Sequence, residues 1–139
     1  MAEGILKDLI KKENLSINVE DVKSAGLITE DNLPVSEKSV KALKKMNIDI
    51  SKYRSNSIRR ETLEEFDLIL TMTKSHKTML RQIAPYILDK VYTLSEYIED
   101  ANRDVEDPFG MPQKIYDKTS LTLYKKITKL VEKLKKKGL

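Results

Sequence analysis

The stretch that decides the fold is Asp67-Leu68-Ile69-Leu70-Thr71-Met72-Thr73. Its apolar side chains form a nearly continuous run instead of alternating with polar ones. Such a run is typical of a strand that is buried on both faces, as the strands of a parallel sheet are. We therefore expect a buried β-strand over residues 67–73.

Outward from this strand, helical and extended patterns alternate along the chain. Expected helices span residues 2–13, 36–47, 62–66, 75–85 and 113–136, and further strands are expected at 18–24 and 91–94. The longer helices carry apolar residues three and four positions apart, whereas the strands are short runs rich in Val, Ile and Leu. This alternation predicts one α/β domain, in which a parallel sheet has helices on both faces.

Polar residues mark where three of these helices should begin. Ser36, Thr62 and Ser75 are the expected N-caps, because a short hydroxyl side chain accepts a hydrogen bond from a free backbone N–H of the first turn. The side chains expected to face the core are Met79, Leu80 and Ile83 in the helix 75–85, and Ile127, Leu130, Val131 and Leu134 in the helix 113–136.

Length and composition indicate a globular protein. A chain of 139 residues suits a single domain over 1–139, and a domain of this size buries roughly two-thirds of its unfolded surface. No apolar run approaches the about 20 residues of a membrane span, and no signal peptide opens the sequence. The expected location is cytoplasmic, without membrane association.

The charge pattern and the missing cysteine exclude several kinds of site. The net charge of +4 is a small excess of dispersed basic residues, which argues against a nucleic-acid partner. The chain contains no cysteine, so disulfides, thiolate metal sites and cysteine nucleophiles are excluded within these residues. His76 is the only histidine and has no acidic pair at ligand spacing, so we expect no metal and no cofactor.

A long turn-rich segment, 95–112, contains the tetrapeptide Asp107-Pro108-Phe109-Gly110. Asp before Pro favours a turn, Pro restricts φ, and Gly accepts the backbone angles that follow. Turn formation alone accounts for this composition. A loop of this length in a compact domain is, however, usually functional or disordered.

Five motifs in order connect this turn to a known family. They are Met1-Ala2-Glu3-Gly4, Ser24-Ala25-Gly26-Leu27, Asp49-Ile50-Ser51, Leu68 to Thr73 with His76-Lys77, and Asp107-Pro108-Phe109-Gly110. Each motif is weak alone, but together they resemble the low-molecular-weight protein-tyrosine-phosphatase family, of the bacterial type, over essentially the whole chain. The resemblance implies a four-stranded parallel sheet in the order 2-1-3-4.

The same resemblance implies that the central first strand is absent from this chain. In the family that strand ends in a Cys-x5-Arg phosphate-binding loop, followed by Ser-Pro and then by residues that match Met1-Ala2-Glu3-Gly4. We therefore expect an N-terminally truncated domain that begins with the helix after the loop. An open groove is then expected between the strands 18–24 and 67–73, with the helix 2–13 as its floor.

Roles for three residues follow from the resemblance. Asp107 is expected to be the general acid, which protonates the leaving oxygen and then activates water. Ser24 is expected to support the phosphate loop, and Phe109 to contact the substrate at the mouth of the site. Tyr53 departs from the family, where relatives often have histidine before Arg-Ser. The implied partners are a phosphorylated protein or a small phosphomonoester, and phosphate-like anions.

Two functional readings remain open. In the first, the fold is that of a phosphatase, and this chain is incompetent because the nucleophile and the loop arginine are missing. In the second, the short chain is a non-catalytic remnant that binds phosphate or a partner. The intact form acts on phosphotyrosine or, alternatively, on phosphoarginine. Arsenate reduction, a third chemistry on this fold, requires a cysteine relay and is excluded.

Overall fold

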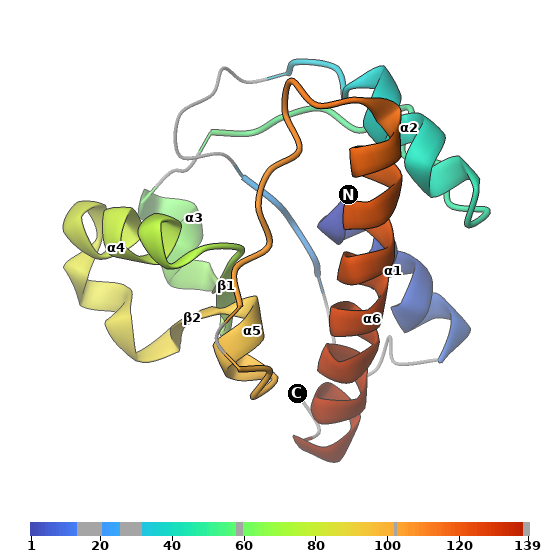
Figure 1. The fold of residues 1–139 in the computed structure, drawn as a ribbon. Helices are drawn as coiled ribbons and strands as arrows, with labels where there is room; N and C mark the ends of the chain where they lie inside the picture. Colours follow the sequence, from blue (N-terminus) through green and yellow to red (C-terminus); the bar gives the residue numbers. More distant parts are fainter. Residues whose placement is uncertain (14–20, 26–31, 58–59, 102, 138–139) are drawn as a thin grey trace.

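The computed structural model describes residues 1–13, 21–25, 32–57, 60–101 and 103–137 (Figure 1). In chain order the elements are α1 (Ala2–Lys12), α2 (Glu37–Lys44), α3 (Arg60–Glu65), β1 (Ile69–Thr71), α4 (Lys74–Ile83), the 3-10 helix η1 (Pro85–Lys90), β2 (Val91–Thr93), α5 (Leu94–Tyr97) and α6 (Gln113–Lys137). None of the helices in these ranges has the length and apolar content needed to cross a membrane.

The sheet of the described residues consists of β1 and β2, which pair in parallel with Ile69 opposite Val91. Both strands are shorter than expected, and Leu94 begins α5 instead of ending β2. The parallel pairing of the segments 67–73 and 91–94 is confirmed. Of the expected strand 18–24, residues 18–20 lie outside the described residues, and 21–25 do not form a strand.

Helices cover both sides of this sheet. Figure 1 shows α6 beside α1 and α2 on one side, and α3 and α4 on the other. The larger core cluster joins α1, α2 and α6, and the expected inward face of α6 is buried at Ile127, Leu130, Val131 and Leu134. A second cluster, of Leu63, Leu80, Ala84, Ile87 and Val91, fills the opposite side. The α/β class with a helix-flanked parallel sheet is therefore confirmed.

Helix starts agree with the sequence at one position and differ at two. Ser36 caps α2, since its hydroxyl oxygen accepts from the Ser39 N–H at 3.2 Å. The cap of α4 is Thr73 and not Ser75, because Thr73 has the extended backbone of a cap and its Oγ1 accepts from His76 N–H. Thr62 lies inside α3, which begins at Arg60.

Two further expectations were wrong in detail. Ile83, expected to face the core, is 36% exposed, because it lies in the last turn of α4, whereas Leu80 is buried. Segment 95–112 is not loop throughout, since α5 occupies its start. The cause is a capping box: Glu96 N–H donates to Thr93 Oγ1, and Thr93 N–H donates to the Glu96 carboxylate.

One edge of β1 is unusual for a strand in an apolar core. Among the described residues β1 pairs with β2 alone. Several apolar side chains that pack against the larger core are only partly buried, among them Met1, Ala2, Leu6, Val22, Leu68, Leu70 and Met72. They come from α1, from segment 21–25 and from the β1 region. The groove expected here is bounded in part by residues outside the described ranges.

Candidate functional site

The candidate site is built on the first turn of α1. This helix begins without a side-chain cap, and its first turn contains Glu3. Burial lowers the pKa of the Met1 α-amino group, and the carboxylates of Glu3 and Asp107 oppose that shift. Asp107, which is 106 positions away in a chain of 139 residues, therefore lies close enough to the start of α1 to act on its charge.

Close packing holds this turn in place. A Cβ added at Gly4 would lie 2.4 Å from Cγ2 of Ile50, so only glycine allows α1 to approach the segment 48–50 this closely. Gly4 itself is buried, and Ile5 beside it is fully buried. The packing explains physically why glycine ends the Met1-Ala2-Glu3-Gly4 motif.

Ser24 is joined to the same turn. Its hydroxyl donates to Oε1 of Glu3 at 2.7 Å, and the other oxygen of that carboxylate accepts from Lys7 Nζ at 2.9 Å. The Lys7 ammonium also lies 5.3 Å from the centre of the Tyr53 ring. Glu3 therefore connects Ser24 to α1, a role that the sequence analysis did not assign.

The Asp107 segment forms the expected turn. Oδ1 of Asp107 accepts from the Phe109 N–H at 3.0 Å, and Met111 N–H donates to the Pro108 carbonyl at 2.9 Å. Gly110, with φ of 80°, has the left-handed backbone that the third position of a type II turn requires. The Asp107 side chain is exposed, and Phe109 is 84% exposed, so Phe109 does not pack into the core.

The segment before this turn is attached to the carboxyl end of β1. Val105 is buried, and its N–H donates to the Met72 carbonyl at 2.9 Å. Next to it, Oδ1 of Asp104 accepts from the Lys74 N–H, at the start of α4, at 3.0 Å. These two bonds hold the chain shortly before Asp107 at the carboxyl edge of the sheet, where α/β proteins usually bind ligands.

A buried lysine provides a second attachment. Lys126 of α6 is 6% exposed, and its ammonium donates to Ser95 Oγ and to Asp100 Oδ2, at 2.9 Å each. The Ser95 hydroxyl in turn donates to the Arg103 carbonyl. The sequence analysis missed this residue. Its position in the sequence could have indicated burial, because Lys126 stands between Leu123 and Leu130 on the buried face of α6.

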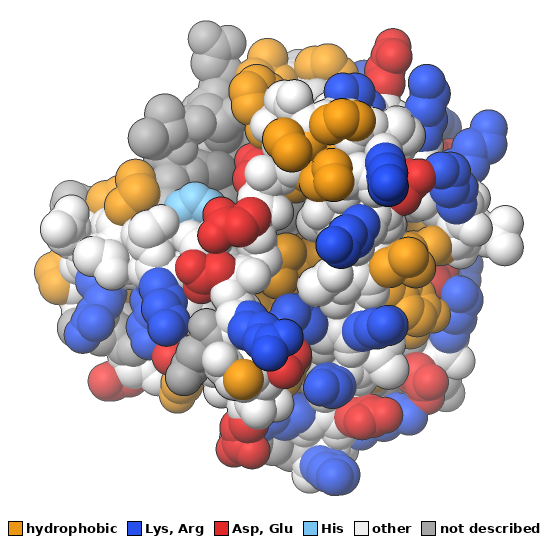
Figure 2. Space-filling view, in the orientation of Figure 1, with side chains coloured by type: hydrophobic (Ala, Val, Ile, Leu, Met, Phe, Trp, Pro, Cys, Tyr) orange, Lys and Arg blue, Asp and Glu red, His pale blue; other side chains and the backbone are white. Residues whose placement is uncertain are grey.

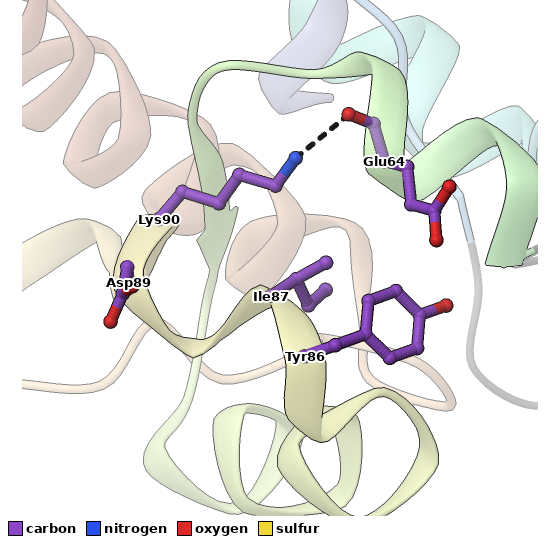
Figure 3. Close-up of a pocket in the computed structure, with 5 residues that line it drawn as sticks. All are labelled: Glu64, Tyr86, Ile87, Asp89 and Lys90. Carbon is purple, nitrogen blue, oxygen red and sulfur yellow. Dashed lines mark hydrogen bonds between the residues drawn. The ribbon is translucent and has the colours of Figure 1, made fainter.

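Two other features are separate from this site. A hollow of about 300 Å³ lies between α3 and η1, lined by Glu64, Tyr86, Ile87, Asp89 and Lys90 (Figure 3). The Lys90 ammonium donates to the Glu64 carbonyl at 3.0 Å and so links η1 to α3. His76 lies in the first turn of α4, as expected, and no metal-binding cluster occurs among the described residues.

Ser24 is thus hydrogen-bonded to the first turn of α1, and the Asp107 carboxylate acts on the charge at the start of that helix. A helix N-terminus favours anions through its free N–H groups and its dipole. Phe109 projects from the turn that carries Asp107 and makes the surface next to it apolar.

Comparisons with known proteins show the family of this chain. The sequence profile of the family described as low molecular weight phosphotyrosine protein phosphatase matches residues 1–139. The protein-arginine-phosphatase of Bacillus subtilis is 35% identical over 136 residues, covering 98% of this chain and 88% of the relative. The low molecular weight protein-tyrosine-phosphatase PtpB of Staphylococcus epidermidis is 30% identical, covering 97% and 86%.

Solved structures show the same similarity. A mutant YwlE arginine phosphatase with a phosphorylated active-site serine matches with a TM-score of 0.91 and 34% identity, covering 97% of this chain and 86% of the other. The low molecular weight protein tyrosine phosphatase of T. tengcongensis matches with a TM-score of 0.87 and 40% identity, covering 95% and 88%.

Proposed function

Because the chain belongs to the low-molecular-weight phosphotyrosine protein phosphatase family, we propose that its fold serves the hydrolysis of a phosphomonoester on a protein. In this proposal Asp107 is the general acid that protonates the leaving oxygen and then the base that activates water. Ser24 supports the phosphate-binding loop, and Phe109 contacts the substrate beside the phosphoryl group.

The observation that carries the proposal is the convergence of Ser24 and Asp107 at the start of α1. Ser24 donates to Glu3 in the first turn, and Asp107 acts electrostatically on the Met1 amino group. The two residues come from segments far apart in sequence, and both act on the helix start, where the dipole favours an anion. In this proposal Ser24 would support the loop that holds a phosphoryl group at that turn, and Asp107 would supply the proton.

The reaction also requires a nucleophile, which these 139 residues do not supply in the family's form, because they contain no cysteine. A phosphorylated active-site serine is named for a mutant of one relative, which supports a covalent phosphoryl-enzyme in the family. We therefore propose that these 139 residues do not hydrolyse phosphate esters by themselves. Hydrolysis should require a strand and Cys-x5-Arg loop preceding Met1.

Phosphotyrosine is the first candidate substrate, and phosphoarginine is the second. Relatives of both kinds have comparable identity to this chain: 35% for the protein-arginine-phosphatase of Bacillus subtilis and 40% for the protein tyrosine phosphatase of T. tengcongensis. On the turn, Phe109 is exposed and is followed by Gly110, which has no side chain. Phe109 is therefore the aromatic side chain that this turn presents to a substrate. Hydrolysis of phosphotyrosine and phosphoarginine peptides of matched sequence separates the two substrates.

The test uses an extended protein, in which an apolar strand, a Cys-x5-Arg loop and Ser-Pro precede Met1. We expect it to hydrolyse phenyl phosphate, whose leaving group is poor, and we expect Asp107→Asn to reduce the rate. Glu106→Gln is the matched control, because Glu106 is an exposed neighbouring carboxylate. A folded extended protein without turnover would refute the proposal and favour a non-catalytic, phosphate-binding role. Equal losses in the two variants would remove Asp107 from its role.

A further inference from the structure

Between the end of α2 and the start of α6 lies a hollow of about 350 Å³, lined by Lys41, Lys44, Lys45 and Gln113. We refer to these four residues as the lysine basin. All three lysine side chains are exposed. Figure 2 shows that basic side chains also gather over α2 and α6 on this side of the molecule. The basin therefore combines a concave shape with positive charge.

One wall of the basin is held by specific bonds. Gln113 Nε2 donates to the Lys38 carbonyl at 2.8 Å and to Asp117 Oδ1 at 3.0 Å. The Lys45 ammonium bonds to the other oxygen of Asp117. Lys45 and, to a smaller extent, Gln113 hold the pKa of Asp117 below its ordinary value. The wall of the basin thus already stabilises the negative charge of one carboxylate, that of Asp117.

Positive charge remains after this pairing. Segment 37–49 contains four lysines against the carboxylates of Glu37 and Asp49. Asp49 is hydrogen-bonded to Ser51, and Lys44 and Lys52 contribute to the lowered pKa of its carboxyl group. Lys41 and Lys44 both lie in the last turn of α2, where the helix dipole favours a cation. Lys41 and Lys44 are the charges available to a ligand.

The basin is attached to the turn that carries Asp107. Lys38 Nζ donates to the Met111 carbonyl at 2.7 Å, and Met111 N–H donates to Pro108. Between Asp107 and Gln113, Phe109 is 84% and Met111 is 45% exposed. The surface next to Asp107 is therefore apolar, at Phe109 and Met111, and it becomes basic at the lysine basin.

We propose that the lysine basin binds an acidic segment flanking the phosphorylated residue of a protein substrate. The inference rests on the proposed function, since it assigns the phosphoryl group to the start of α1. A peptide supplies apolar and acidic side chains in turn and so matches the surface described. A nucleic acid carries a phosphate at every step and would place some of its phosphates against the apolar side chains of Phe109 and Met111.

The test is binding of a fluorescent, unphosphorylated peptide whose tyrosine is followed by an apolar residue and then Glu-Asp-Glu. A second peptide with Gln-Asn-Gln in that place is the neutral reference. The variant is Lys41→Glu with Lys44→Glu, which leaves Lys45 and its bond to Asp117 intact. The matched control is Lys125→Glu with Lys136→Glu, because both lysines are exposed on α6 away from the basin and give the same change of net charge.

We expect the acidic peptide to bind more tightly than the neutral one at low salt. The basin variant should weaken acidic-peptide binding about tenfold and the control about twofold or less, because exposed charges act mainly within a Debye length. Equal losses from both variants, or equal binding of the two peptides, would overturn the proposal. Tighter binding of a single-stranded oligonucleotide that is lost in the same variant would also overturn it. The assay requires no turnover, so it remains valid if the extended protein fails to hydrolyse phosphate esters.

Discussion

The Nζ atom of Lys126 lies 2.9 Å from Oδ2 of Asp100, although α6 and the segment after α5 are separate elements of the chain. The lysine is buried, while the Asp100 side chain is 31% exposed. Glu99 and Ala101, which flank Asp100, both have positive φ, at 59° and 48°. The ion pair thus attaches a turn with unfavourable backbone angles to the longest helix, a few residues before Asp107.

The first prediction is that Lys126→Met destabilises the protein. The methionine keeps the length of the buried stem but removes the bonds to Asp100 and Ser95, and losing hydrogen bonds to a charged group should cost roughly 1–3 kcal/mol. Urea unfolding measures this loss, with exposed Lys125→Met as the control. Amide hydrogen exchange should rise most in residues 103–107. A loss no larger than that of the control would show that the pair does not anchor this segment.

The second prediction is that the purified 139-residue chain has no measurable activity on p-nitrophenyl phosphate. Removing a catalytic nucleophile typically costs several orders of magnitude in rate. Asp107→Ala serves as the comparison, because any residual rate should be the same in both proteins. Turnover that depends on Asp107 would show that a Cys-x5-Arg loop is not needed.

The third prediction concerns the role of Asp107 in the extended protein. Protonation matters only when departure of the leaving group is difficult, and a general acid typically contributes about 10²–10⁴ in rate. Asp107→Asn should therefore slow the release of phenol by such a factor and the release of p-nitrophenol much less. Burst kinetics on the two esters measure this contrast. Equal losses for both esters would contradict the assignment.

The fourth prediction is a loss of stability in acid. The hydrogen bond from Lys77 lowers the pKa of Glu96 from its ordinary value of 4.5. A group with a lowered pKa in the folded state stabilises the protein above its unfolded pKa, and this contribution disappears as the pH falls through the folded pKa. Lys77→Met should thus lower the melting temperature at pH 7, and by less at a pH well below the ordinary pKa of 4.5. Lys125→Met should be neutral at both values, and a pH-independent effect of Lys77→Met would argue against the linkage.

The fifth prediction is that the extended protein melts at a higher temperature and more cooperatively than the 139-residue chain. Among the described residues β1 pairs with β2 alone, and Leu68 and Leu70, in and next to β1, are only partly buried. Each buried polar group of a strand edge left without a partner costs about 1–3 kcal/mol, and several would rival the about 5–15 kcal/mol stability of a domain. Calorimetry tests this. A cooperative, high-melting transition in the monomeric 139-residue chain would show that the fold tolerates an open edge.

Local patterns in the sequence were sufficient for much of the architecture. The apolar run around Leu70 predicted β1, the stripe from Ile127 to Leu134 predicted the buried face of α6, and Ser36 predicted the start of α2. These features depend on residues within about four positions of one another, so the sequence displays their cause. Where two local signals competed, as between Thr73 and Ser75, the sequence did not show which hydroxyl would take the cap.

The sequence by itself determined the class of fold, the family resemblance and the turn at Asp107. Only the tertiary structure decided that Ser24 donates to Glu3, that Asp107 lies near the Met1 amino group, and that Lys126 is buried against Asp100. Such distances result from the packing of all the intervening elements, because a hydrogen bond requires an accuracy of a few tenths of an ångström that no local pattern carries. The same packing leaves Phe109 exposed, although a phenylalanine side chain is equally suited to a protein core.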